Sequence, residues 1–363
     1  MKKKVFLYAY DKVNLGDDLF IRTIVNRYPA ATFFLWSNKE NKKIFEDCKN
    51  LVVIDRDSKF NQFLNKVRAS LSVRYQERLK RKCDAVVYIG GSIFMEYPSW
   101  KNIIEWWNYQ SSHYPFYVVG ANFGPYQSKE YKDAMGEMFI NLEDVCFRDK
   151  YSYNLFQKID TVRYAPDILF SYPMPIVEKK KKQIYISVIN CIDKEDGKYK
   201  CYALEYENMI STIINHFLNN GYYIKLVSFC KEEGDEEAVR RIKNMFCNHN
   251  RYKYIQELNY NGQNYKEVLY ELASSEYVVA TRFHAIILSL LAKQKVFPIL
   301  YSNKSKNMLK DIGFLGNSIE LSNLDEFEIN EVFSNIQKGI QADIEKLTRD
   351  SRQHFCVLDQ VLN

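Results

Sequence analysis

Short β-branched and aromatic runs alternate with helix-period stretches along most of this chain, and this alternation constrains its fold more than any other feature. Parallel strands need long crossover connections, which are usually helices, so the pattern predicts an α/β fold with parallel sheets. The expected strands are residues 5–10, 32–36, 51–54, 85–89, 116–120, 145–147, 162–164, 184–189, 223–229, 254–256, 277–280 and 296–300.

Two domains are expected, because 363 residues exceed what one hydrophobic core usually supports. Two prolines in residues 171–175 and four lysines at 179–182 are typical of an exposed linker. We therefore expect an N-terminal Rossmann-like domain over 1–175, a C-terminal one over 183–323 and a helical tail over 324–363. Ligands of such folds bind at the carboxyl ends of the strands, so we expect the two domains to face each other across a cleft.

Composition narrows the class of function. The net charge, 51 − 45 = +6, is mild and suits an anionic substrate or a membrane surface rather than nucleic acid. The eight cysteines form no C-x-x-C pair, which favours reduced, mostly buried thiols in a cytosolic protein over a disulfide frame or a metal site. The chain has neither a Walker loop nor a G-x-G-x-x-G motif, which argues against a typical ATPase or dehydrogenase.

Membrane contact remains an open alternative. Neither a transmembrane run of about 18 apolar residues nor a signal peptide is expected. Residues 60–82, however, have apolar residues at helical spacing together with many lysines and arginines. Such a basic amphipathic helix either lies on an anionic membrane or packs its apolar face on the domain and keeps its charges in water.

The most informative local motif is Arg282-x-His284, which follows a β-branched run and precedes an apolar helical stretch. The expected strand, tight turn and helix place both residues at the carboxyl edge of a sheet and at a helix N-terminus, where backbone N–H groups bind anions. Arginine adds bidentate donors for phosphate or carboxylate, and histidine can move a proton near neutral pH. A capping or packing role for His284 is the simpler reading.

Other polar residues and glycines follow the expected strands of the first domain. Asp17 or Asp18 is expected to cap the first helix, and glycines allow close approach of the backbone to a ligand. Arg148 is a second candidate for anion binding, with an ordinary ion pair as the alternative. The further candidates at these strand ends are Asn14, Gly90, Gly91, Ser92 and Asn122.

Taken together, these motifs resemble the polysaccharide pyruvyl transferase family over about residues 5–315. The resemblance rests on Asn14-x-Gly16-Asp17, Gly90-Gly91, Gly120…Gly124-Pro125, Arg148-Asp149…Ser152, Pro166-Asp167, Arg282-x-His284 and Lys293…Pro298. The chain departs from the family where Gly90-Gly91-Ser92 replaces a commoner triple glycine and where Phe283 occupies a usually aliphatic position. The resemblance implies a fold similar to GT-B glycosyltransferases.

The resemblance also implies an activity. Such enzymes transfer pyruvate from phosphoenolpyruvate to a sugar, form a ketal and release phosphate, with phosphoenolpyruvate as co-substrate and without a cofactor or metal. His284 would transfer a proton, as acid or as base, and Asp17 would orient or deprotonate the acceptor hydroxyls. Arg282 and Arg148 would hold the donor, with Phe283 and Ala285 beside them. The residues expected on the acceptor side are Asn14, Gly90, Gly91, Ser92 and Asn122.

The acceptor and the location follow from the same resemblance. We expect a sugar on a polyprenyl-diphosphate-linked oligosaccharide and a cytoplasmic enzyme, in peripheral contact with the inner membrane face if residues 60–82 bind lipid. One alternative is a GT-B-type glycosyltransferase that uses a nucleotide-sugar. Another is a non-enzymatic sugar-binding protein, which the combination of Arg282, His284 and Arg148 disfavours.

Overall fold

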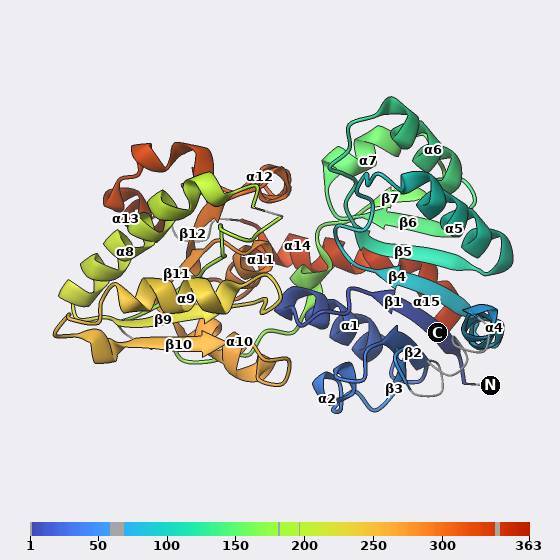
Figure 1. Ribbon diagram of the computed structural model, residues 1–363, viewed down its shortest axis with the longest axis horizontal. Coiled ribbons are helices and arrows are strands. Elements are labelled where there is room, and N and C mark those ends of the chain that lie inside the picture. The colour runs from blue at the N-terminus through green and yellow to red at the C-terminus, as the bar shows by residue number, and fades with distance from the viewer. Residues whose placement is uncertain (1, 59–68, 181, 196, 338–341) are drawn as a thin grey trace. The chain divides into compact units, whose positions relative to one another are not determined.

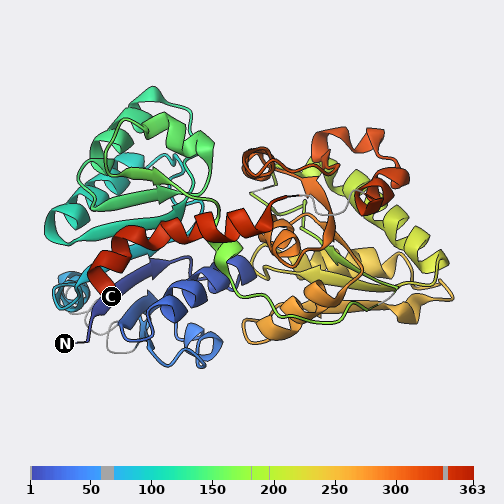
Figure 2. The ribbon, with the colours of Figure 1, turned by 180° about the vertical axis from the view of Figure 1, so that it is seen from behind.

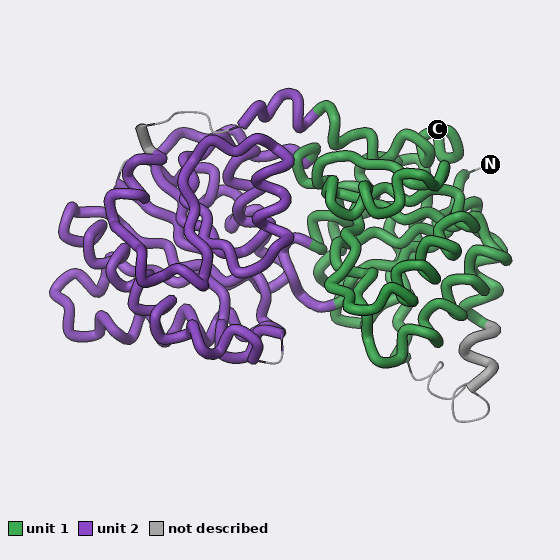
Figure 3. Tube along the Cα trace, turned by 90° about the horizontal axis from the view of Figure 1, so that it is seen from above, with its two compact units in different colours: residues 1–11, 17–171, 349–363 green, residues 12–16, 172–348 purple. Residues whose placement is uncertain are grey.

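The computed structural model describes residues 2–58, 69–180, 182–195, 197–337 and 342–363. The chain divides into two compact units, shown in different colours in Figure 3. The first unit comprises Met1–Asp11, Asp17–Ser171 and Arg349–Asn363, and the second comprises Lys12–Gly16 and Tyr172–Thr348. Each unit is therefore built from more than one stretch of sequence.

The first unit contains a parallel sheet with strand order β3-β2-β1-β4-β5-β6-β7 among the described residues (Figure 1). Its strands are β1 (Lys4–Ala9), β2 (Thr32–Ser37), β3 (Leu51–Asp55), β4 (Ala85–Ile89), β5 (Phe116–Ala121), β6 (Asp144–Phe147) and β7 (Val162–Tyr164). Its helices are α1 (Leu15–Arg27), α2 (Asn41–Ile44), α4 (Ala69–Lys80), α5 (Trp100–His113), α6 (Lys129–Phe139), α7 (Lys150–Phe156) and α15 (Cys356–Leu362), with 3₁₀ turns at Ile168–Ser171 and Arg352–Phe355.

The second unit has a parallel sheet of order β10-β9-β8-β11-β12-β13 over the same described ranges. Its strands are β8 (Gln183–Ser187), β9 (Tyr223–Ser228), β10 (Ile255–Asn259), β11 (Tyr277–Ala280), β12 (Lys295–Leu300) and β13 (Ile319–Glu320). Its helices are α8 (Ala203–Asn219), α9 (Asp235–Asn244), α10 (Tyr265–Ser274), α11 (Phe283–Leu291), α12 (Asn303–Asp311) and α13 (Ile329–Gln337), with 3₁₀ turns at Lys200–Tyr202, Tyr252–Tyr254 and Leu321–Glu326. Helix α14 (Ile344–Ser351) crosses the boundary to the first unit.

Both sheets reverse their strand order at one point, between β1 and β4 in the first unit and between β8 and β11 in the second. This is the doubly wound arrangement, in which ligands bind outside the carboxyl ends of the strands at the point of reversal. The central strands β5 and β8 are buried along their whole length, as expected for strands covered by helices on both faces. The predicted pair of parallel-sheet α/β domains is confirmed.

The predicted helical tail over 324–363 does not form one unit. The part of this tail up to Thr348 belongs to the second unit, whereas Arg349–Asn363 belong to the first (Figure 3). This last segment is the red helical stretch that ends at the C-terminus in Figure 2. Polar contacts hold this last segment in the first unit: Arg27 binds Asp359 through Nε at 2.9 Å and through Nη2 at 2.5 Å. Arg163 also donates to the carbonyl of Gln353 at 2.8 Å.

The predicted basic amphipathic segment is only partly described, because residues 60–68 lie outside the described ranges. Within α4, Lys80 is buried and donates to Glu77 at 2.7 Å and to Gln110 at 2.8 Å. Lys80 therefore belongs to the interior of the first unit and not to a basic surface. Arg78, Arg81 and Lys82 are exposed. Among the described helices, none is long and apolar enough to cross a membrane.

The cysteines agree only in part with the prediction of mostly buried thiols. All eight lie within the described residues and are free thiols. Cys48, Cys146, Cys191 and Cys230 are buried, whereas Cys201 and Cys247 are exposed.

His354 makes the stability of the first unit depend on pH. Its Nε2 lies 2.9 Å from the carbonyl of Pro166, and burial lowers its pKa from 6.5 to about 3. The unfolded chain therefore binds a proton below about pH 6.5 that the folded chain does not, and stability falls as the pH drops. Lowering the pH from 7 to 5 should cost about 2 kcal/mol through this residue.

The measurement is urea unfolding of the wild type and of His354→Gln at both pH values. The variant should lose the corresponding part of the pH dependence, whereas His113→Gln, at an exposed histidine, should retain it. An equal fall in stability for the wild type and His354→Gln would contradict this assignment.

Candidate functional site

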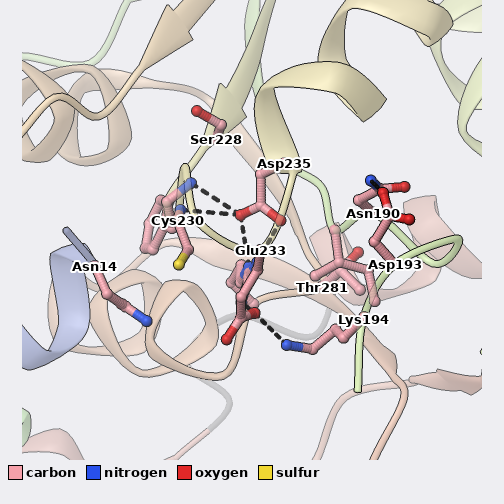
Figure 4. A network of polar contacts seen from close by, with 12 residues as sticks. Asn14, Asn190, Asp193, Lys194, Ser228, Cys230, Glu233, Asp235 and Thr281 are labelled. Atoms are coloured by element: carbon pink, nitrogen blue, oxygen red, sulfur yellow. Dashed lines mark hydrogen bonds and ion pairs between the residues drawn. The ribbon is translucent and has the colours of Figure 1, made fainter. Parts of the chain in front are cut away.

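Several charged residues lie in the loops at the reversal point of the second sheet. The loop after β8 carries Asn190 and Lys194, and the turn after β11 carries Thr281 and Arg282. The loop after β9 adds Glu233 and leads to Asp235. Because the carboxyl ends of parallel strands share one edge of a sheet, these side chains converge, as Figure 4 shows.

The turn that presents Arg282 is held by the neighbouring strand. Thr281 is fully buried, its N–H donates to the carbonyl of Ser187 at 3.1 Å, and its hydroxyl lies 2.8 Å from that of Tyr206. Arg282 has extended backbone angles and immediately precedes α11, so that His284 lies in the first helical turn. The predicted strand, turn and helix around this motif are confirmed.

The Arg282 side chain is buried and bound by two carboxylates. Its Nε donates to Asp235 Oδ2 at 2.7 Å, and its Nη2 and Nη1 donate to Asp235 Oδ1 and Glu233 Oε2. Burial acts to lower the pKa of Arg282, but Asp235 and Glu233 raise it well above its ordinary value. The guanidinium therefore remains charged although it is excluded from water.

Asp235 is the more deeply buried of the two carboxylates. It is completely inaccessible, and its Oδ2 also accepts the backbone N–H groups of Phe229 at 3.2 Å and Cys230 at 3.0 Å (Figure 4). These bonds compensate for the loss of water around the charge. Asp235 thus orients Arg282 against the loop that follows β9.

Lys194 is a second buried cation at this edge and donates to Glu233 Oε2 (Figure 4). Its Nζ lies 5.0 Å from the centre of the Tyr301 ring. Burial acts to raise the pKa of Tyr301, but Lys194, Lys304 and Arg282 lower it below its ordinary value. Burial likewise acts to raise the pKa of Glu233, but Arg282 and Lys194 lower it to about 2.

Four residues of this cluster were not predicted from the sequence: Asp235, Glu233, Lys194 and Tyr301. Each follows an expected strand closely, and that position is the signal that could have identified it. The acidic pair at 233 and 235 precedes an expected helix, where carboxylates are common for reasons of local capping alone.

The loop between β1 and α1 joins the same edge of the second unit. Asn14 forms an isolated β-bridge with Cys230, and the N–H of Leu15 donates to the carbonyl of Phe229 at 3.1 Å. A Cβ atom added to Gly16 would lie 1.6 Å from Nδ1 of His284. The motifs Asn14-x-Gly16 and Arg282-x-His284, far apart in sequence, are therefore in contact.

The expected cap of the first helix needs correction. Asn14 Oδ1 accepts the N–H of Gly16 at 3.1 Å, so Asn14 caps α1. Asp17 and Asp18 lie within the first turn, where the helix dipole stabilises a negative charge.

The two neighbours of His284 in sequence, Phe283 and Ala285, are buried. The Phe283 ring lies 5.2 Å from that of His284 and nearly perpendicular to it, at 77°.

A second cluster lies at the carboxyl edge of the first sheet. Arg148 donates to Asp167 at 2.9 Å and to Asn122 at 2.8 Å, and Ser92 donates to the same Asn122 oxygen at 3.2 Å. A Cβ atom added to Gly91 would lie 2.4 Å from Arg148 Nη2, so glycine is needed for this close approach. Gly90 does not contact Arg148 in this way, because its added Cβ would first meet Ile93, at 3.3 Å.

Both Arg148 and Asp167 are buried, and burial raises the pKa of Asp167 even though Arg148 opposes the rise. The structure therefore brings Gly91, Ser92, Asn122 and Arg148 together within the first unit. It brings Asn14, Arg282 and His284 together within the second. Asp17 belongs to the first unit.

Replacing Gly16 should disturb this contact with His284. Either the loop or the imidazole must move to admit the added methyl group of Gly16→Ala, and overpacking of this kind costs about 1–3 kcal/mol. Gly136→Ala in α6 is a matched control, because its Cβ would lie 3.5 Å from the nearest atom. It should be neutral or stabilising by up to about 1 kcal/mol. Equal unfolding free energies for the two variants would contradict the contact.

The comparisons with known proteins identify both relatives and fold. One relative is the amylovoran biosynthesis protein AmsJ of Erwinia amylovora, 21% identical over an alignment of 264 residues that covers 66% of this chain. The chain spans about 62% of the length of that curated relative.

Similar solved structures include UDP-GlcNAc 2-epimerase from Neisseria meningitidis, with a TM-score of 0.61, 10% identity and coverage of 99% of both chains. Anabaena Alr3699/HepE in complex with UDP-glucose has a TM-score of 0.58 and 11% identity, covering 98% of this chain and 96% of that one. ADP-heptose LPS heptosyltransferase II of E. coli has a TM-score of 0.51 and 14% identity, covering 92% and 97%. At these identities the likeness establishes the GT-B fold alone.

The model of one family, described as polysaccharide pyruvyl transferase, matches residues 14–303. This match includes both clusters described above and most of the chain. The protein therefore belongs to the polysaccharide pyruvyl transferase family.

Proposed function

We propose that this protein transfers pyruvate from phosphoenolpyruvate to two hydroxyls of one sugar, forming a pyruvate ketal on a polysaccharide precursor and releasing phosphate. Membership of the family supports a pyruvyltransferase role in polysaccharide biosynthesis. The observation that carries the finer proposal is the position of Arg282 and His284. A cation and a group that transfers protons lie two residues apart, where α11 begins at the reversal point of the second sheet.

The reaction needs both kinds of group. A proton is added to the methylene carbon of phosphoenolpyruvate, and the oxygen of a sugar hydroxyl bonds to the adjacent carbon and loses its own proton. The C–O bond to phosphate then breaks, and the oxygen of a second hydroxyl of the same sugar bonds to the same carbon, closes the ketal and gives up its proton to the released phosphate. His284 is the proposed proton carrier, in agreement with its half-buried position in the first turn of α11.

The other roles follow from the same proposal. Arg282 stabilises the negative charge of the donor, together with the N-terminus of α11. Arg148 is the proposed second anion ligand, and Asn122 hydrogen-bonds donor or sugar. Asp17 orients the acceptor hydroxyls. No step needs a metal or a cofactor.

The test is the release of phosphate from phosphoenolpyruvate, with polyprenyl-diphosphate-linked acceptors that end in galactose, glucose or a mannosamine-type sugar. The wild type should release phosphate only with an acceptor and should add the mass of pyruvate to it. His284→Ala should lower kcat by about 10²–10⁴-fold, the usual contribution of a general acid or base.

His249→Ala is the matched control, because His249 lies in the second unit outside the Arg282 cluster, and it should retain the wild-type rate. Full activity of His284→Ala would remove the assigned role. Tight binding of a nucleoside diphosphate, without phosphate release for any acceptor, would instead favour a glycosyltransferase that uses a nucleotide-sugar.

A lipid-linked acceptor implies contact with a membrane surface. The exposed residues Arg78, Arg81 and Lys82 at the end of α4 are the proposed basic contact. Each basic residue near an anionic surface contributes about 1 kcal/mol, so the triple glutamine variant should bind vesicles containing phosphatidylglycerol roughly 100-fold more weakly in a sedimentation assay.

The control removes three exposed lysines elsewhere in the same unit, at Lys42, Lys43 and Lys49. Its binding to vesicles should fall much less than that of the α4 variant. Equal losses in the two triple variants would show that the effect is one of net charge and not of the α4 surface.

A further inference from the structure

One carboxylate oxygen lies between the two buried cations at the reversal point of the second sheet. Glu233 Oε2 accepts from Nζ of Lys194 and also from Nη1 of Arg282. Lys194 is 5% exposed and Arg282 is 6% exposed, so bulk water solvates neither cation. Two cations that follow different strands and converge on one oxygen are an arrangement by which proteins bind an oxygen of a phosphate.

The two carboxylates around Arg282 differ in how firmly they are held. Asp235 is fully buried, and four donors bind its two oxygens: two nitrogens of Arg282 and the backbone N–H groups of Phe229 and Cys230. Within the described residues, the side chain of Glu233 accepts hydrogen bonds through Oε2 alone. Its side chain is 31% exposed.

The backbone around Glu233 also leaves its side chain room to turn outward. Lys231 and Glu232 before it are exposed, and Gly234 after it has a φ of +74°, just before α9 begins. A rotation about side-chain bonds would return the Glu233 carboxylate to water and leave the backbone of α9 in place. Asp235 would continue to hold Arg282 while Glu233 moved.

We propose that Glu233 is a displaceable counter-ion, and that Lys194 is an anion-binding residue that holds the donor phosphate together with Arg282. This inference rests on the proposed function for the identity of the donor. In the ligand-free protein, Glu233 neutralises cations that would otherwise be buried without a partner. When phosphoenolpyruvate binds, its phosphate oxygens take the place of Oε2, and Glu233 moves into solvent.

If Glu233 is displaced by phosphate, the affinity for phosphate depends on the charges of Glu233 and Lys194. Phosphate must compete with Glu233, so the observed affinity is lower than the affinity of the open cation pair. Removing the competing charge in Glu233→Gln should therefore strengthen binding, whereas removing a cation in Lys194→Met should weaken it. A merely structural ion pair predicts no gain for either substitution.

The experiment is isothermal titration of the whole protein with inorganic phosphate and with phosphoenolpyruvate, in the absence of acceptor. Glu233→Gln should lower both dissociation constants about tenfold, and Lys194→Met should raise both at least tenfold, the range of a charge-assisted hydrogen bond. Glu232→Gln and Lys198→Met change exposed neighbours of the same charge and should stay within about twofold of the wild type.

Weaker or unchanged binding in Glu233→Gln would overturn the proposal. Because Lys194→Met could unfold the second unit, Lys194→Arg serves as a second variant: it retains the charge and should bind within about threefold of the wild type. Loss of binding in Lys194→Arg, with an unchanged melting temperature, would also count against the proposal.

Failure of the proposed function is recognised separately. If phosphate binding follows the expected order of variants but phosphoenolpyruvate is neither bound nor converted, the counter-ion inference stands and the donor is another phosphate compound. If the wild type converts phosphoenolpyruvate and Lys194→Met has the same KM for it, the function stands and the counter-ion inference is wrong.

Discussion

The buried carboxylate of Asp235 makes the contacts on which the carboxyl edge of the second sheet depends. It joins the guanidinium of Arg282 to the backbone that follows β9. The carbonyl of Phe229 in that same backbone accepts the N–H of Leu15, which anchors the start of α1 and the preceding loop with Asn14. Three loops far apart in sequence are thereby held by one charged group, whose burial is compensated by its four donors.

Arg148 is the corresponding buried arginine of the first unit. Its guanidinium is buried at the carboxyl edge of the first sheet and is held by Asp167 and Asn122. In both units the sheet places an arginine after a buried strand, and a carboxylate far along the chain orients it. A cation held in this way is already desolvated and oriented in the folded chain.

The sequence predicted the strands well for a physical reason. In a sheet covered on both faces the inner strands are buried along most of their length, so they appear in the sequence as mainly apolar runs between polar turns, as in β5 and β8. The C-terminal tail was harder to place, because the pattern of an amphipathic helix does not say which sheet it covers. That choice depends on contacts such as Arg27 with Asp359, 332 residues apart.

The residues of the candidate site could be predicted from the sequence only in part. Arg282, His284, Arg148 and Asn122 follow buried strands, so their position at the carboxyl edges could be expected. Glu233 and Asp235 also follow a buried strand, but carboxylates before a helix are ordinary in any protein, so that position alone did not distinguish them. Their role at this edge depends on ion pairs with Arg282, which lies 47 residues beyond Asp235, and these pairs form only in the folded chain.

The division of the chain has a consequence for the order in which it folds. The first unit contains Asp17–Ser171 and also Arg349–Asn363, with nearly all of the second unit encoded between them. During synthesis the ribosome therefore completes the second unit's stretch, Tyr172–Thr348, before the first unit has received the residues that bind Arg27 and Arg163. The first unit therefore cannot be completed before the second unit's stretch has been made, in contrast to the usual N-terminal-first order of multidomain chains.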